Sequence, residues 1–316
     1  MDRLSRFRTE IMGAAILLVV LFHLTFRINN NELWHIPFTH GMIGVDVFFL
    51  LSGLGLSYSF SKNDSLKSYY FNRIFRIFPF YGVVVFFHGF VLRDLSLQEL
   101  LLQWTTIGYW TTGSYYDWYV PNLILMYLIF PVWYYIIKHF FSVSILLFLL
   151  FTSCVIIRDS GLNFMAWARY PSFLMGVLIH QRMYSLTTRS VKLVALFLFV
   201  FCLLTVLLLH LSYSNSELIS NGWLFKPHIL ATTGLCIILS YVAMIPIVST
   251  ILKLFGRMSF EVYLLHGVFT GYALDLAEIN GWSKSVIGVA FLFISFFVAY
   301  YCQIINKKLY IHFKVK

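Results

Sequence analysis

Five polar side chains lie in or beside long apolar stretches, and their types and spacing suit acid–base chemistry and anion binding. His23 lies within ILLVVLFHLTF, and Asp46 and Ser52 lie within GMIGVDVFFLLSG. A histidine with a carboxylate in reach is the usual arrangement of a general base, because the carboxylate fixes the imidazole tautomer and stabilises its protonated form. Arg73 and Arg76, in NRIFRIFP, share one helix face, and a guanidinium pair binds phosphate through forked hydrogen bonds.

Each of these groups also has a purely structural interpretation. A lone intramembrane histidine can simply form a hydrogen bond with a backbone carbonyl or a serine of a neighbouring helix. An arginine pair is the ordinary basic anchor at the inner surface of a membrane. Metal binding is not indicated, because no second histidine or carboxylate stands at helical ligand spacing beside His23.

A third set of polar residues is distributed along one apolar segment, GRMSFEVYLLHGVF, at residues 256–269. Its candidate cavity residues are Ser259, Glu261, Tyr263 and His266. His266 lies about 14 Å of helix beyond Arg257, at a middle depth like that of His23. Two histidines from different segments at similar depth predict one polar cavity, and they would equally suit a proton path in a transporter.

Composition defines the class of protein that must position these groups. The chain has 316 residues, of which 60% are hydrophobic and only 11% charged, and its mean hydropathy is +0.81. An ordinary water-soluble domain is excluded by such values. The four cysteines, Cys154, Cys202, Cys236 and Cys302, show neither a disulfide framework nor a zinc spacing, so we interpret them as apolar packing residues.

Apolar runs long enough to cross a hydrocarbon core of about 30 Å predict about ten transmembrane helices. They lie near residues 11–28, 42–60, 77–93, 117–137, 140–158, 168–183, 191–211, 228–248, 256–275 and 285–306. Residues 94–116 mix leucine with tryptophan and tyrosine, which favours an interfacial or re-entrant piece. The sequence therefore predicts an all-α polytopic bundle that forms a single membrane domain over residues 1–316, with no appended soluble domain.

Lysines and arginines predict the orientation of this bundle. With a cytoplasmic N-terminus, most of the 23 basic residues fall on the inner side, and an even number of spans places the basic C-terminus there too. The net charge of +10 is then a consequence of topology, and no nucleic-acid partner is needed to explain it. The first span shows no small-residue cleavage site and should remain as a signal anchor.

The order of these segments resembles the acyltransferase-three family of integral membrane O-acyltransferases, which includes O-antigen and peptidoglycan O-acetylases. The resemblance is carried by VVLFH, GVDVFFLLSG, NRIFRIFP, DWYVPNLILMYLIFPVW, PSFLMGVLI and GRMSFEVYLLH. They recur in the family's order across residues 11–269, and the combination is specific although each piece is weak.

By this resemblance His23 matches the family's catalytic histidine, and Asp46 and Ser52 match its second-span motif. Arg73 and Arg76 match the paired arginines associated with acyl-CoA. The resemblance further implies a multi-pass protein of a bacterial plasma membrane. Acetyl-CoA is the implied donor, and the implied acceptor is a hydroxyl of an extracytoplasmic cell-surface glycan or lipid-linked sugar.

One position departs from the family's pattern. The family commonly carries an arginine eleven residues before the histidine, and this chain has Met12 there. Arg8, one turn earlier on the same helical face, or the intervening Glu10 could replace or alter that role.

These observations lead to a hypothesis of acyl transfer. The arginines would hold the phosphates of a cytoplasmic acyl-CoA, and His23 would remove the proton from the acceptor hydroxyl or take the acyl group transiently while Asp46 orients it. Ser52 and Tyr263 rank below His23, as hydrogen-bond partners of a developing oxyanion.

Two alternatives come from other classes of protein. An exporter of glycan or lipid intermediates would also have many spans and polar residues at the midplane, although the two halves of the chain show no matching polar motifs. A purely structural membrane protein would leave the gathering of histidines, aspartate and arginines unexplained.

Overall fold

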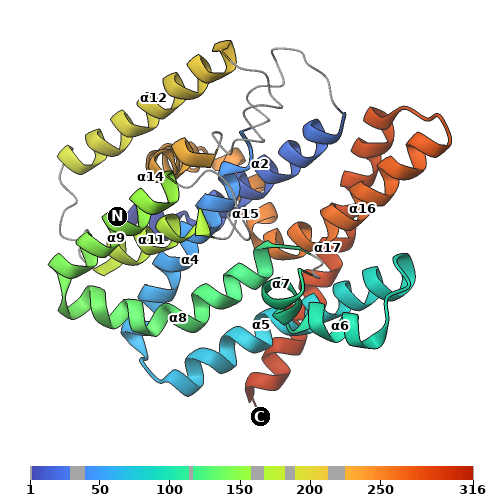
Figure 1. Ribbon diagram of the computed structural model, residues 1–316, viewed down its shortest axis with the longest axis horizontal. Coiled ribbons are helices and arrows are strands. Elements are labelled where there is room, and N and C mark those ends of the chain that lie inside the picture. Colours follow the sequence, from blue (N-terminus) through green and yellow to red (C-terminus); the bar gives the residue numbers. More distant parts are fainter. Residues whose placement is uncertain are drawn as a thin grey trace.

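The computed structural model is all-α over the residues that it describes, which are 2–28, 40–113, 117–157, 167–181, 189–212 and 225–315 (Figure 1). Its helices are α1 (Asp2–Arg6), α2 (Arg8–Ile28), α4 (Ile43–Lys62), α5 (Leu66–Phe86) with its π-helical continuation η2 (Phe87–Leu92), α6 (Leu97–Trp104), α7 (Ile107–Thr111), α8 (Tyr119–His139), α9 (Phe141–Ile157), α11 (Tyr170–Gln181), α12 (Arg189–Ser212), α14 (Phe225–Val242), α15 (Pro246–Arg257), α16 (Ser259–Ile279) and α17 (Lys284–Val315).

The helices confirm the prediction of a polytopic bundle. Each of the predicted spans overlaps a helix. By length and composition, helical segments long and apolar enough to cross a membrane are found at Ile43–Lys62, Leu66–Phe90, Tyr119–His139 and Lys284–Asn306. Shorter apolar helices occupy Leu193–Leu208 and His228–Val242.

Several boundaries differ from the predicted ones. The span predicted near 77–93 begins earlier, at Leu66, so Arg73 and Arg76 lie inside α5 instead of at its foot. The span predicted at 228–248 is divided, since α14 ends at Val242 and α15 starts at Pro246. Proline has no amide hydrogen and is favoured in the first turn of a helix, so it begins a new helix at this point.

In the stretch 94–116, predicted to be interfacial or re-entrant, the described residues include α6 and α7, both too short to cross a membrane. A capping box begins α6: the Ser96 hydroxyl accepts from the Glu99 amide at 3.4 Å, and the Glu99 carboxylate accepts from the Ser96 amide at 2.9 Å. The Ser96 hydroxyl also donates to the Glu99 carboxylate at 2.7 Å, and this bond, together with that from the Ser96 amide, holds the pKa of Glu99 below its ordinary value.

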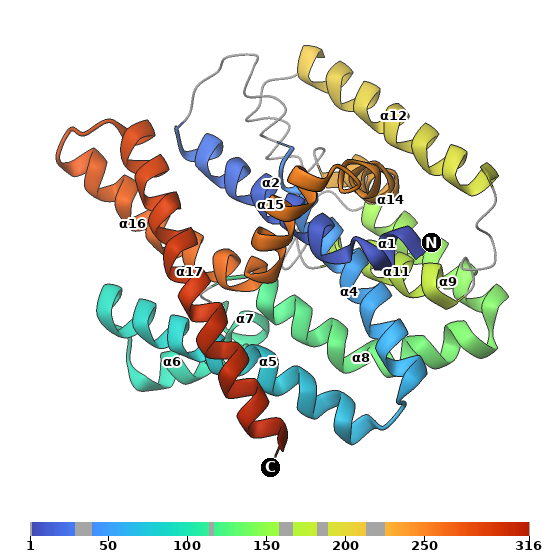
Figure 2. The ribbon, with the colours of Figure 1, turned by 180° about the vertical axis from the view of Figure 1, so that it is seen from behind.

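Helix α4 forms the centre of the bundle, with α2 on one side and α11 on another (Figures 1 and 2). Glycines allow α4 and α11 to touch backbone to backbone. A Cβ added to Gly53 would lie 2.2 Å from the Phe173 carbonyl oxygen, and one added to Gly176 would lie 2.0 Å from that of Leu50. Small residues at helix contacts are the usual means of close packing in membranes.

We predict that Gly176→Ala destabilises the protein by about 1–3 kcal/mol, because the added methyl meets the backbone of α4, which cannot move aside locally. Gly267→Ala is the matched control, since no atom lies within 4 Å of a Cβ built there. Thermal unfolding in detergent micelles measures both variants. Equal unfolding temperatures for the two variants would contradict the close packing of α4 and α11.

Candidate active site

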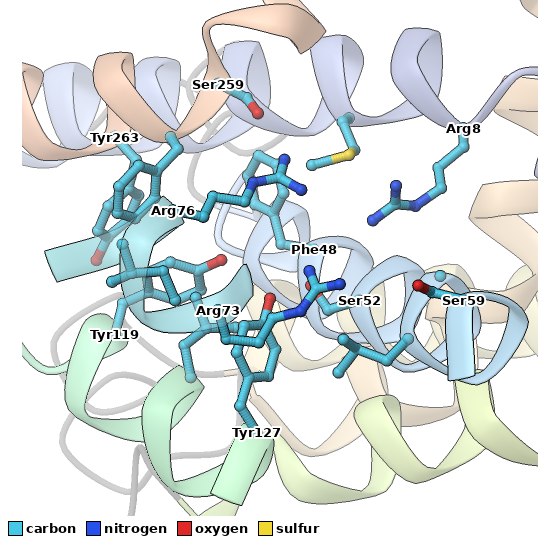
Figure 3. Close-up of a pocket in the computed structure, with 16 residues that line it drawn as sticks. Arg8, Phe48, Ser52, Ser59, Arg73, Arg76, Tyr119, Tyr127, Ser259 and Tyr263 are labelled. Atoms are coloured by element: carbon cyan, nitrogen blue, oxygen red, sulfur yellow. The ribbon is translucent and has the colours of Figure 1, made fainter. Parts of the chain in front are cut away.

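Three arginines converge on one cavity of about 200 Å³ (Figure 3). Arg8 comes from α2, and Arg73 and Arg76 come from successive turns of α5. Ser52 of α4 and the tyrosines Tyr119 and Tyr127 of α8 line the same space, as do Ser259 and Tyr263 of α16. The predicted sharing of one face by Arg73 and Arg76 is therefore confirmed, and Arg8 joins them.

These guanidinium groups have no carboxylate partner among the described residues. The Arg8 Nε donates to the Leu51 carbonyl oxygen at 3.1 Å. The Arg73 guanidinium lies 5.8 and 5.9 Å from the ring centres of Tyr69 and Tyr127, and its buried Nε has no hydrogen-bond acceptor within the described part of the chain. No carboxylate of the described part of the chain lines this cavity, so the three cations around it form a site for an anion with several charges.

A glycine makes room for Arg8. A Cβ on Gly55 would lie 2.7 Å from the guanidinium carbon of Arg8, so any larger residue on this face of α4 would push that side chain away. Met12, one turn further along α2, also lines the cavity. The structure thus places Arg8 where it can supply the positive charge that Met12 lacks.

A second cavity, of about 380 Å³, adjoins the first, and six residues line both: Met12, Ser59, Arg73, Arg76, Ser259 and Phe260. Its other polar lining residues are Asn72, Arg257, Glu261, Gln303 and Asn306. The Asn306 side-chain amide donates to the Glu261 carboxylate at 3.1 Å. Amides and a further cation make this space suitable for a polar ring system beside the anion site.

Aromatic side chains connect the first cavity to the histidines. The rings of Tyr119 and Tyr263 lie 4.5 Å apart, and the ring of Tyr263 lies 5.6 Å from that of His266. The His266 Nε2 is 3.2 Å from the His23 Nδ1. The two histidines therefore meet, as their similar depth predicts, but neither lines the two cavities described above. They lie one aromatic contact from the arginine cavity.

Comparison with known proteins supports one family. A family model described as "Acyltransferase domain" (Acyl_transf_3) matches residues 13–304, nearly the whole chain. The chain belongs to the acyltransferase-three family. It is 32% identical over 128 residues to "Acyltransferase MdmB" of Streptomyces mycarofaciens, and the alignment covers 34% of this chain and 32% of that protein. The chain thus aligns with about a third of that relative's length. No solved structure matches the chain significantly.

In this acyltransferase-three protein Asp46 does not orient His23, contrary to the hypothesis drawn from the sequence. Its fully buried carboxylate forms an ion pair with Arg169 and accepts a hydrogen bond from the Ser172 hydroxyl at 3.0 Å. The reason is the helical period: Asp46 lies on the same face of α4 as Gly53, which meets α11, whereas Gly44 lies on the opposite face and meets α2.

Arg169, the partner of Asp46, is not among the site residues that the sequence predicts. It is 1% exposed, and its guanidinium lies 5.9 Å from the ring of Trp118 in addition to pairing with Asp46. A signal was present in the sequence, because an intramembrane aspartate needs a cation of its own, and Arg169 lies at the edge of a predicted span.

Two other candidates lie away from the histidines. Ser52 lines the arginine cavity, where it could contact the anion but not the imidazole of His23. Glu10 accepts a hydrogen bond from the Ser249 hydroxyl at 3.2 Å and lines neither cavity. It joins α2 to α15, where a Cβ on Gly256 would lie 1.8 Å from the Thr9 carbonyl oxygen. Glu10 therefore contributes to helix packing beside the site.

Proposed function

We propose that this acyltransferase-three protein is a membrane O-acyltransferase. It transfers an acyl group, acetyl in the simplest case, from acyl-CoA to a hydroxyl of a glycan or lipid-linked sugar on the opposite side of a plasma membrane. The observation that carries the proposal is a cavity with three arginines and no carboxylate partner among the described residues, with a tyrosine-lined end in contact with a histidine pair. The family match favours this function over the exporter alternative.

The donor is proposed to bind with its phosphates on Arg8, Arg73 and Arg76. Its nucleotide then occupies the adjoining cavity, where Asn72, Gln303 and Asn306 offer amide groups to the base and the ribose. The surplus of basic residues on the side of these arginines agrees with donor entry from the cytoplasm, with both chain termini on that side.

The distance from the arginines to the histidines suits an extended thioester arm. Met12 lines the cavity and His23 lies eleven residues later in α2, which is about 16 Å along the helix. The phosphopantetheine arm of coenzyme A, when extended, has a length of this order. The thioester carbonyl of a donor held by the arginines can therefore approach His23.

In the proposed reaction His23 acts as general base. Its Nε2 takes the proton of the acceptor hydroxyl while the hydroxyl oxygen attacks the thioester carbonyl carbon. The carbon–sulfur bond then breaks, and the departing thiolate takes the proton back from His23. The products are an ester and free coenzyme A, so atoms and charges balance without a further reactant.

The proposal is tested by acetyl-CoA binding to the detergent-purified protein, measured by calorimetry. Arg73→Ala/Arg76→Ala should weaken binding by about 10²-fold or more, because charge-assisted hydrogen bonds contribute about 1.5–3 kcal/mol each. The control is Arg6→Ala/Arg93→Ala, which removes two exposed arginines that line neither cavity. Equal affinity of the two double variants, or no binding by folded wild-type protein, would refute acyl-CoA as the donor.

A further inference from the structure

We propose that His266 is a positioning residue that holds His23 in its basic tautomer, in the place that a carboxylate takes beside most catalytic histidines. The catalytic consequence rests on the proposed function, whereas the tautomer follows from contacts alone. In the structure the Asp46 carboxylate pairs with Arg169 and accepts from Ser172, so it does not orient His23. On a neighbouring helix, His266 contacts the Nδ1 of His23.

The contacts of His266 assign its proton. Its Nδ1 lies 3.0 Å from the Val262 carbonyl oxygen, one turn earlier in α16. A carbonyl oxygen only accepts hydrogen bonds, so Nδ1 carries the hydrogen and donates it. A neutral imidazole has one N–H, and therefore the Nε2 of His266 presents a lone pair towards His23.

The same reasoning then fixes His23. Its Nδ1 faces two acceptors, the Nε2 of His266 at 3.2 Å and the Val19 carbonyl oxygen at 2.9 Å. Both contacts are favourable only when Nδ1 carries the hydrogen, which leaves the lone pair on Nε2. Nε2 is thus the atom of His23 that can take a proton from an acceptor hydroxyl.

Two acceptors from different helices act on this tautomer. The Val19 carbonyl oxygen accepts both the main-chain N–H and the Nδ1–H of His23, just as the Val262 carbonyl oxygen accepts both groups of His266. His266 adds an acceptor from a neighbouring helix, on a side chain that is only 3% exposed and whose ring also contacts Tyr263. The Nε2 of His266 is therefore well fixed in space, and it continues to accept from the Nδ1 of His23 when His23 becomes an imidazolium.

Nitrogen NMR of the full-length protein, labelled with ¹⁵N-histidine and held in lipid bilayers, tests the assignment without turnover. The His23 signals are those missing from His23→Gln. In the wild type the Nδ1 of His23 should be protonated and Nε2 unprotonated. In His266→Leu the population with protonated Nδ1 should fall, and in His266→Gln it should be retained, because a glutamine oxygen can stand near the former Nε2. Protonated Nε2 in the wild type, or no change in His266→Leu, would overturn the inference.

Release of coenzyme A from acetyl-CoA, with water as the probe acceptor, gives the second readout. His266→Leu should lower kcat by about 10²-fold with little change in the KM for acetyl-CoA, and His266→Gln should restore most of that loss. His228→Leu is the matched control, because His228 is also 3% exposed and contacts His40 at 3.2 Å, yet lines neither cavity.

The two proposals fail in different ways. If acetyl-CoA does not bind but the NMR tautomers are as assigned, acyl-CoA is refuted as the donor and the proposed role of His266 in fixing the His23 tautomer is retained. If acetyl-CoA binds through the arginines and His266→Leu matches His228→Leu in both kcat and tautomer, the proposed function stands and the role of His266 is refuted.

Discussion

His23→Gln is expected to lower acyl transfer by about 10²–10⁴-fold, the usual contribution of a general base. Glutamine fills a similar volume but cannot take a proton at neutral pH. His23 does not line the arginine cavity, and Met12, which does, lies about 16 Å away along α2, so binding of the donor phosphates should be unchanged. The loss should therefore appear in kcat, with the KM for acetyl-CoA close to that of the wild type.

Steady-state coenzyme A release and calorimetric binding of acetyl-CoA measure the two effects separately. His40→Gln is a suitable control, because His40 also forms a histidine pair, with His228, but this pair links the start of α4 to α14 away from both cavities. Wild-type turnover by His23→Gln would remove His23 from the mechanism. An equal loss in His40→Gln would indicate general damage to the bundle.

Asp46→Asn is expected to destabilise the protein by about 3–5 kcal/mol, the usual cost of removing one partner of a buried ion pair. Asp46 is fully buried and Arg169 is 1% exposed, so the guanidinium would keep its charge without a counter-ion in an apolar surrounding. Arg169→Met should be similarly harmful, because it leaves the carboxylate unpaired.

The double variant Asp46→Leu/Arg169→Met distinguishes a structural ion pair from a catalytic aspartate. Replacing both charges with apolar groups is often neutral for stability, so unfolding temperatures should return towards the wild-type value. If Asp46 acts only through Arg169 and Ser172, the double variant should also retain acetyl-CoA turnover. A stable but inactive double variant would restore Asp46 to the catalytic site, and a double variant as unstable as Asp46→Asn would refute the ion-pair account.

The sequence by itself determined the class of protein and the places of its helices. Long apolar runs leave no other structure in a membrane, because each backbone polar group must find its partner within the segment. Local spacing also placed Arg73 and Arg76 on one face, and the count of residues along each helix placed His23 and His266 at similar depth. Such features depend only on a rise of about 1.5 Å and a turn of about 3.6 residues.

Only the tertiary structure decided which side chains meet. The depth of a residue in the membrane does not say which way its side chain points around the helix axis. That direction brings Asp46 to Arg169 and His23 to His266. Likewise, Arg8 reaches the cavity because Gly55 of another helix leaves space for it. Contacts of this kind arise from the packing of helix faces in three dimensions, where glycines set the distances between helix axes. A sequence pattern predicts the depth of a residue along its own helix, but it does not say which residues of other helices lie beside it.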